Sequence, residues 1–362
     1  MSPMGLSLRT LGSFVAVCCA LLACGGDAPT APRFEPPELG SLPDRVSERR
    51  CLVGVEGGAT PPPRLSETGC FTSVVPLVAT DELVPFAVVS PLFSDETHKS
   101  RWLAIPPGQR ADWYDDGTLD VPVGSVLAKR FASDDGALEL RFSVRAETGF
   151  VFFTYRFEGD DARLLEGQET TDFALPDGRE AHYVFPARET CRTCHGEVGV
   201  LGPSVAQLTM PVRYDGVLRP QLDALTALGL VAPRPDAVGM PSPLDTEAPL
   251  EARARAYLHA NCGHCHRPGG FAPVGLTLDL RWSTPTEATQ TVCVPTQFAA
   301  TAGEGMRIDP AYPDASVIVR RMRALGGDFP GPMPPIGRSV VDEHAAQLVL
   351  DWAASLDASL CP

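Results

Sequence analysis

The clearest alternation of apolar and polar positions lies between Ala137 and Arg145. Apolar side chains occupy one face of an extended segment there and polar side chains the other: Leu138, Leu140, Phe142 and Val144 against Glu139, Arg141, Ser143 and Arg145. A period of two predicts a half-buried strand. A second, aromatic strand is expected over residues 150–157, and the short link 146–148 predicts a hairpin. Further short strands are expected at residues 85–90, 101–105, 126–131 and 182–185. We therefore expect a sandwich or barrel-like β-rich domain over residues 46–185.

The pattern changes to a helical period towards the C-terminus. Within residues 186–245, a short helix is expected at 221–228. Within residues 246–362, helices are expected at 249–260 and 316–325, and Ser339 with Asp342 predicts the start of a third in the capping-box pattern. The fold class predicted is thus α+β and multidomain, with the β-rich domain followed by an all-α domain over residues 246–362.

The N-terminal residues are predicted to be a targeting signal rather than part of the fold. Arg9 precedes a mainly apolar run that ends Leu21-Leu22-Ala23-Cys24. This order of charged, apolar and small residues is typical of a signal peptide. Residues 1–23 are therefore expected to be a lipoprotein signal, with Cys24 as the lipidated residue; a buried N-terminal helix is the alternative. The Pro-rich residues 24–45 are expected to form a tether.

Charge narrows the range of partners. The 362 residues carry 30 basic and 45 acidic side chains, a formal charge of −15. An acidic chain is a poor match for nucleic acid or anionic lipid, so no nucleic-acid partner is expected. We expect periplasmic or membrane redox proteins as partners and attachment to the membrane through the N-terminal lipid, which places the protein in the periplasm or at the outer membrane or cell surface.

Two of the cysteine pairs lie in motifs that indicate covalent attachment of a cofactor. Cys191-Arg-Thr-Cys194-His195 and Cys262-Gly-His-Cys265-His266 both have the form C-x-x-C-H, the attachment signature of c-type haem. The two thiols can each form a thioether to the haem, and the following histidine becomes an iron ligand. Two covalently bound haems c are therefore expected. The alternatives are a Cys₄ zinc site, whose pairs need no trailing histidine, and a redox disulfide.

Four further cysteines remain once the two motifs, Cys24, and Cys18 and Cys19 of the expected signal peptide are set aside: Cys51, Cys70, Cys293 and Cys361. An even remainder in an exported chain indicates disulfides. The pairings Cys51–Cys70 and Cys293–Cys361 are favoured because each stays within one candidate domain, while four free thiols are the alternative.

The order of features in residues 246–362 is helix, C-x-x-C-H, loops, Met333-Pro334 and terminal helix. This order resembles class I cytochrome c, and the resemblance implies that Met333 is the distal ligand opposite His266. A core methionine is the alternative. We also expect a backbone carbonyl of the loop at residues 267–273 to accept the His266 ring N–H.

Several short segments recur, in this order, in a family of exported dihaem proteins. They are Pro91–Asp95, Lys99–Trp102, Pro122–Ser125, Gln207–Leu208 and Tyr257–Cys262. The chain resembles this uncharacterised family, known as conserved hypothetical proteins with a cytochrome c domain, over roughly residues 85–355. The resemblance implies two haems and a location outside the cytoplasm, but no reaction. Thr209 stands where the family typically has Asn, so Met210 inherits no ligand role from the family.

The distal ligand of the first haem is left open by the sequence. Candidates are Met210 and Met240 nearby, and His182 or His98 from the β-rich region, with Met210 favoured as strongly as an open iron. The choice bears on function. Two six-coordinate haems suit electron transfer, the leading hypothesis, whereas an open first haem suits a peroxidase-like enzyme or a sensor. A third possibility is that the β-rich region binds a substrate or an oxidoreductase partner whose electrons pass to the haems.

Overall fold

An antiparallel sheet of six strands, in the order β10-β9-β8-β7-β4-β3, forms the centre of the fold. We describe a computed structural model, which covers residues 34–196, 199–234, 236, 238–298 and 303–361. Its sheet strands are β3 (Val84–Pro85), β4 (His98–Ala104), β7 (Val126–Ser133), β8 (Gly136–Ala146), β9 (Gly149–Glu158) and β10 (Asp161–Leu164).

Four two-stranded ribbons accompany the sheet. They are β1 (Phe71–Ser73) with β2 (Val78–Ala79), β5 (Asp112–Trp113) with β6 (Leu119–Asp120), β11 (Glu169–Ala174) with β12 (Glu180–Phe185), and β13 (Pro211–Tyr214) with β14 (Val217–Pro220). The hairpin predicted from the alternation at residues 137–145 is confirmed as β8–β9, in which Phe142 pairs with Phe153.

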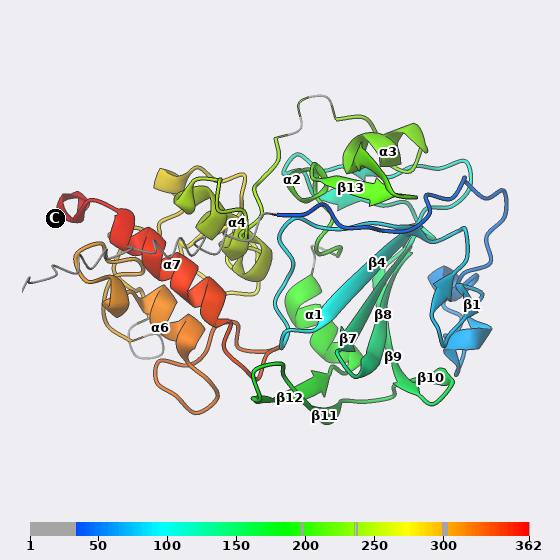
Figure 1. Ribbon diagram of the computed structural model, residues 1–362, viewed down its shortest axis with the longest axis horizontal. Coiled ribbons are helices and arrows are strands. Elements are labelled where there is room, and N and C mark those ends of the chain that lie inside the picture. The colour runs from blue at the N-terminus through cyan, green and yellow to red at the C-terminus, as the bar shows by residue number, and fades with distance from the viewer. Residues whose placement is uncertain (1–33, 197–198, 235, 237, 299–302, 362) are drawn as a thin grey trace, which may run out of the picture. The chain divides into compact units, whose positions relative to one another are not determined.

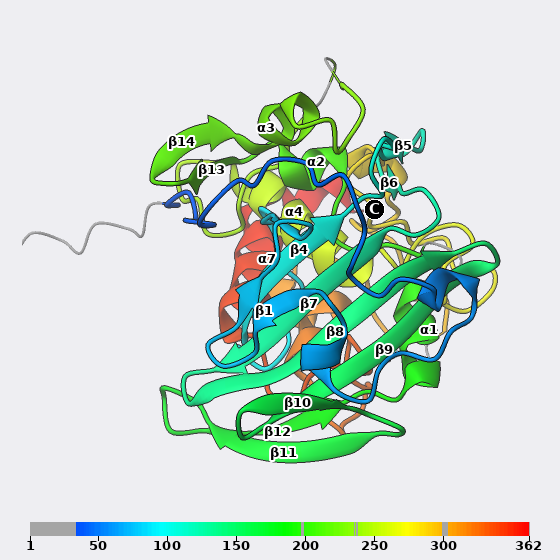
Figure 2. The same ribbon diagram turned by 90° about the vertical axis from the view of Figure 1, so that its right-hand side faces the viewer.

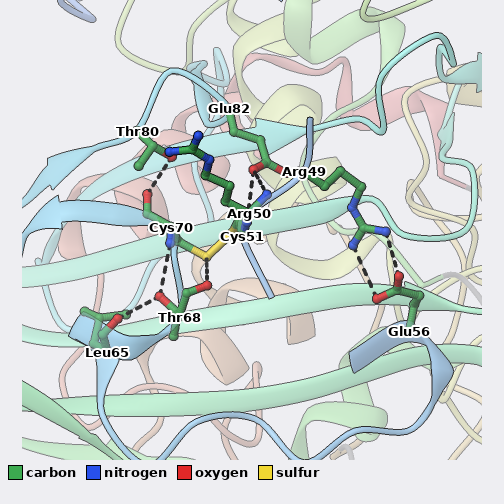
Figure 3. Close-up of a disulfide and its surroundings, with 9 residues drawn as sticks. All are labelled: Arg49, Arg50, Cys51, Glu56, Leu65, Thr68, Cys70, Thr80 and Glu82. Atoms are coloured by element: carbon green, nitrogen blue, oxygen red, sulfur yellow. Dashed lines mark hydrogen bonds and ion pairs between the residues drawn. A yellow bond between two sulfur atoms is a disulfide. The ribbon is translucent and has the colours of Figure 1, made fainter. Parts of the chain in front are cut away.

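One face of the sheet is covered by the disulfide-linked segment that precedes it. Leu140, Phe142 and Val144 of β8 pack there, as the alternation predicts, against a core that includes Leu65 and Phe71. The Cys51–Cys70 disulfide lies in this core with both cysteines fully buried (Figure 3). This is one of the two pairings that the sequence favours.

Several backbone groups around that disulfide are hydrogen-bonded. The Glu82 carboxylate accepts hydrogen bonds from the backbone N–H groups of Arg50 and Cys51, at 2.7 and 2.9 Å, and the Thr80 hydroxyl donates to the Cys70 carbonyl at 3.1 Å (Figure 3). A buried carboxylate is tolerated when it receives such bonds. They fix the disulfide-linked segment over the sheet.

The α-helices among the described residues are short and few. They are α1 (Arg188–His195), α2 (Val205–Leu208), α3 (Gln221–Ala227), α4 (Leu250–Cys262), α6 (Val317–Arg323) and α7 (Glu343–Ser355). Single 3₁₀ turns lie at η1 (Val55–Gly57), η2 (Leu65–Glu67), η3 (Thr286–Ala288), η4 (Pro313–Ala315) and η5 (Ala358–Leu360). Figure 1 shows α4, α6 and α7 grouped on one side and the six-stranded sheet on the other.

The three C-terminal helices form where the helical period predicts them. Their starts differ in detail, because Asp342 rather than Ser339 caps α7, accepting a hydrogen bond from Ala345 N–H at 3.0 Å. Helices α4 and α7 pack together around a core centred on Trp352, which is 1% exposed. The disulfide Cys293–Cys361, the second favoured pairing, joins a loop of this region to the chain end.

The expected fold class is nevertheless wrong. The molecule is mostly β-sheet, and residues 246–362 do not form an all-α domain like class I cytochrome c, because long loops rather than helices make up most of the region. Pro, Gly and Thr are frequent in those loops and do not favour helix. The expected sandwich or barrel is also replaced by a single sheet with open edges at β10 and β3.

The described part of residues 32–362 belongs to one compact unit. Cys24 and the expected signal peptide lie outside the described residues. Within the described ranges, none of the helices combines the length and the apolar character needed to span a membrane.

Candidate functional site

Both C-x-x-C-H motifs line the same cavity. We call Cys191–His195 the first motif and Cys262–His266 the second; all four of their cysteines and both histidines border a cavity of about 860 Å³. Its size lies in the upper part of the usual range for cofactor pockets. The first motif ends α1, and the second begins at the last residue of α4. Motifs that start 71 positions apart in sequence therefore face one space.

The cavity lies on the face of the sheet opposite the Cys51–Cys70 core. Leu127, Lys129 and Phe131 of β7 and Arg141 and Ser143 of β8 border it. The polar face of the predicted strand at 137–145 therefore faces this internal space rather than the outer surface. Helix α1 contacts β9 (Figures 1 and 2), which brings the first motif onto the sheet.

The first motif holds its histidine in a defined orientation. The ring of His195 packs against that of Phe152 on β9, with centroids 4.6 Å apart. Its Nδ1–H donates to the Gly199 carbonyl at 2.6 Å, so the ring proton lies on Nδ1 and the lone pair is on Nε2. Burial lowers the pKa of His195 to about 4, which keeps the imidazole neutral at pH 7. This is the state in which histidine binds a metal.

Gly199 is needed at that position for two reasons. Its φ of +70° lies in the left-handed region, which glycine adopts without strain. A Cβ there would also lie 2.3 Å from Cε2 of Phe150. The carbonyl that orients His195 therefore depends on a residue without a side chain.

The second motif differs in this respect. His266 Nδ1 is buried and has no hydrogen-bond partner in the described part of the chain. The expectation that a carbonyl of residues 267–273 accepts the His266 N–H was therefore wrong. Burial, with a smaller contribution from Arg321, lowers the pKa of His266 to about 4, so this imidazole is also neutral at pH 7. Among the described residues, no acceptor fixes the orientation of the His266 ring through Nδ1.

The Cys194 and Cys265 thiols of the two motifs are close enough to influence each other's protonation. Hydrogen bonding from Cys265 and His264 lowers the pKa of the Cys194 thiol to about 4, and the same contact raises the pKa of Cys265. Burial raises the pKa of Cys191, and that of Cys262 to about 12. The four motif cysteines are free thiols, whereas Cys51, Cys70, Cys293 and Cys361 form disulfides.

Asn261, just before the second motif, ties that motif to the β-rich region. Its Oδ1 accepts a hydrogen bond from the Phe93 backbone N–H at 2.7 Å, and its Nδ2 donates to the carbonyls of Tyr257 and Pro91 at 3.1 and 3.4 Å. Asn261 is 2% exposed, so these bonds are shielded from water. Two of the segments that recur in the resembled family, Pro91–Asp95 and Tyr257–Cys262, therefore meet at this residue.

Gln207 belongs to the same set of buried contacts between the β-rich region and α4 as Asn261. Its amide exchanges two hydrogen bonds with the Ser90 backbone, at 2.9 and 2.8 Å, and the Ser90 hydroxyl donates to the Ala256 carbonyl of α4 at 3.0 Å. Asp95 completes it by accepting hydrogen bonds from the backbone N–H groups of Ser339 and Val340, at 2.6 and 3.1 Å. These buried polar contacts hold the two walls of the cavity together.

The candidate distal ligands fall in different places. Met333 borders the cavity, together with His266. Met210 and Met240 are 6% exposed and pack with Val89 and Tyr214 in an apolar cluster; neither borders the cavity. Met210 thus occupies a core position in this structure and gains no support as a ligand.

The histidine candidates lie towards the surface. The side chain of His98 is 72% exposed and pairs with Asp134 at 2.8 Å, away from the cavity. His182 borders the cavity, but its side chain is 63% exposed and pairs with Asp172 at 2.6 Å. Neither is held facing an iron by a buried contact.

Sequence reasoning missed His259, which also borders the cavity. Its Nδ1 accepts a hydrogen bond from the Trp282 backbone N–H at 3.1 Å, so its ring proton lies on Nε2. Burial lowers the pKa of His259 to about 4. A neutral ring with one nitrogen engaged and the other protonated is a hydrogen-bond donor rather than a metal ligand. Its place within Tyr257–Cys262 was the one available signal.

The residues present fit haem. Each motif offers two free thiols and a neutral imidazole on the wall of one cavity, and Met333 lies on the same wall. Among the described residues, no group of three or more His, Cys, Asp or Glu side chains is arranged to hold a metal ion. Haem asks less of the chain, because the porphyrin itself supplies four ligands and leaves only the axial positions to protein side chains.

Comparison with known proteins yields no relatives: no family model matches the chain, and searches of curated proteins and of solved structures return no match.

Proposed function

We propose that this chain is a dihaem c-type cytochrome that transfers electrons outside the cytoplasm. The observation that carries the proposal is the cavity bordered by both C-x-x-C-H motifs. Cofactors held at these motifs would lie close together, and electron tunnelling slows steeply with distance. Such an arrangement favours transfer between the two centres.

The roles of the residues follow from their chemistry. Each thiol of Cys191, Cys194, Cys262 and Cys265 would add across a vinyl group: the sulfur–carbon bond forms at one vinyl carbon and the hydrogen goes to the other, with no oxidant required. His195 and His266 would supply the proximal nitrogens, and Met333 the distal sulfur at the second motif. When bound, each haem supplies a one-electron iron couple.

The chain contributes rigidity and exclusion of water. The bond from His195 to Gly199, the packing on Phe152 and the buried joint at Asn261 restrict movement of the walls. A cofactor that changes little in coordination between redox states is suited to outer-sphere transfer. We further propose lipidation at Cys24, a periplasmic or outer-membrane location, redox proteins as partners, and membership of the uncharacterised exported dihaem family on the recurring segments quoted above.

The test is a count of covalent haems. Denaturing electrophoresis with a haem-peroxidase stain and intact mass should show two haems in the wild type. The paired variants Cys191→Ser/Cys194→Ser and Cys262→Ser/Cys265→Ser should each retain one, and each serves as the other's control. Zinc or unmodified thiols in the exported wild-type protein would contradict the proposal.

A haem enzyme or sensor with an open first site is a second candidate. Met333 is the one methionine among the described residues that border the cavity, so two haems there would have one methionine between them. Carbon monoxide added to the reduced protein discriminates. Rapid binding at one haem would favour the enzyme or sensor, and two low-spin haems that do not bind carbon monoxide would leave electron transfer.

A further inference from the structure

Three cations form a row across the cavity face of the sheet. Arg101 of β4, Lys129 of β7 and Arg141 of β8 are successive cross-strand partners, and all three border the cavity. We call them the cationic row. Like charges directly opposite one another on a sheet are destabilising, so the row calls for compensating negative charge.

Among the described residues, only one of the three forms an ion pair. Arg141 pairs with Glu139, which is fully buried and also accepts a hydrogen bond from the Tyr183 hydroxyl at 2.6 Å. In the described part of the chain, Arg101 and Lys129 have neither an ion pair nor a hydrogen bond from their side chains. The Lys129 ammonium lies over the Phe131 ring, 4.8 Å from its centroid, which partly offsets the loss of water.

Other cations on the cavity wall do not share this property. Arg234, Arg267 and Arg281 each pair with an aspartate, and Arg338 donates to backbone carbonyls. The unpaired charges on this wall are thus concentrated at Arg101 and Lys129. Arg101 and Lys129 are both partly buried. A cation that loses part of its hydration without gaining a partner is destabilising, so an anion within the cavity is expected beside these two residues.

The cationic row begins with Arg141 near the first motif and ends with Arg101 farther from that motif. Arg141 lies within electrostatic reach of the Cys191 thiol. Arg101 lies two strands further on, which is about 10 Å at the usual strand spacing. That is also the scale of a porphyrin ring, whose thioether-forming vinyl groups and two propionate carboxylates leave opposite edges. Thioethers near Arg141 would place the carboxylates towards Lys129 and Arg101.

We infer that Arg101 and Lys129 bind the propionate carboxylates of the haem attached at Cys191 and Cys194. The inference rests on the proposed function and extends it, since it gives a role to Arg101 within the recurring segment Lys99–Trp102. Two carboxylates balance the two unpaired cations. Arginine and lysine both donate several hydrogen bonds to such oxygens.

The experiment compares the holoprotein with Arg101→Met, Lys129→Met and their double variant. Haem staining and intact mass are measured first, and both haems should remain attached. The redox equilibrium constant of one haem should then fall by about tenfold for each substitution, which is about 59 mV for a one-electron couple, because a lost cation disfavours the reduced iron. The resonance Raman bending mode of the propionates should shift as well. Arg101→Lys should restore most of both signals, and the exposed Arg110→Gln is the control.

The assignment to the first haem is tested in the Cys191→Ser/Cys194→Ser background. There, Arg101→Met should leave the remaining haem unchanged, and a shift of that haem would overturn the assignment. Two attached haems whose potentials and propionate modes are unmoved in the double variant would overturn the inference while leaving the proposed function in place. Wild-type protein without covalent haem would overturn both.

Discussion

His195 and His266 follow identical cysteine spacings, yet their surroundings differ. The Nδ1–H of His195 donates to the Gly199 carbonyl and its ring packs on Phe152, whereas His266 Nδ1 is buried without a partner among the described residues. The comparison teaches that a short motif specifies the covalent chemistry but not the environment of the iron. We expect the first haem to have the lower potential, because His195 would be the more basic ligand and because Met333, the one methionine among the described residues that borders the cavity, is proposed as a ligand of the second haem.

The segment that precedes the sheet and the C-terminal region each contain one disulfide. Removing these disulfides should have the largest effect, a loss in the free energy of unfolding. Cys51–Cys70 closes a loop of 19 positions in the core on one face of the sheet, and Cys293–Cys361 closes a loop of 68 positions that follows the second motif in sequence. Replacing both cysteines by alanine should lower the free energy of unfolding by about 3 kcal/mol in the first case and about 4 kcal/mol in the second. Denaturant unfolding of each variant measures the losses, and a larger loss for Cys51–Cys70 would reverse the expected order.

Replacing the methionine near the second motif should change one haem only. Met333→Ala should lower the redox equilibrium constant of the second haem by roughly a hundredfold, because the thioether favours ferrous iron. It should also abolish the weak long-wavelength band of a methionine–iron bond. Met210→Leu is the matched control, since a volume-conserving change in the core should cost less than about 1.5 kcal/mol and leave the spectrum unchanged. An unchanged spectrum in Met333→Ala would exclude Met333 as a ligand.

The orienting bond of the first motif can be removed at its acceptor. Gly199→Ala should displace the carbonyl that receives the His195 N–H, because the added Cβ meets Phe150. A less basic ligand should raise the redox equilibrium constant of the first haem by roughly tenfold. Gly178→Ala, also at positive φ but with open space around its Cβ, separates backbone strain from this effect. A shift confined to the second haem would contradict the comparison.

The smallest expected effect is a dependence on pH at the joint between the regions. Burial raises the pKa of Asp95 despite its hydrogen bonds to Ser339 and Val340 and the nearby Arg338. The folded state therefore holds this proton more tightly than the unfolded state. Its contribution to stability is complete below the ordinary aspartate pKa and is lost as pH rises through the folded value. Asp95→Asn should flatten unfolding free energy against pH in that window, and an unchanged slope would exclude Asp95 as its source.

Much of the local structure could be predicted from the sequence. The alternation at residues 137–145 predicts the β8 strand and which side chains share a face. It does not say that Arg141 and Ser143 border a cavity, because period-two patterns look the same whether the polar face meets water or a cofactor. Likewise, α4, α6 and α7 were predicted as helices, but the loops between them were too irregular for a helical domain to be inferred or excluded from periodicity.

The residues that border the candidate site were predictable from the motifs, but their assembly around one cavity was not. The C-x-x-C-H spacing identifies Cys191, His195, Cys262 and His266, because both thiols and the histidine must lie within about one helical turn. Nothing in that spacing places Cys194 beside Cys265, or Met210 in a core cluster, since these depend on long-range packing. Arg101 and Lys129 belong to different strands, and only the register of the sheet makes them neighbours.

The hydrogen bond from Ser339 N–H to Asp95 spans 244 positions of the chain. Contacts of such high sequence separation form late in folding, because a long loop must close before they can contribute. A chain that crosses a membrane from its N-terminus would therefore expose both cysteine motifs before residues 339 and 340 arrive to complete the wall. The thiols would be accessible for covalent attachment during that interval. The time that the last residues of the chain take to arrive would set the duration of the interval.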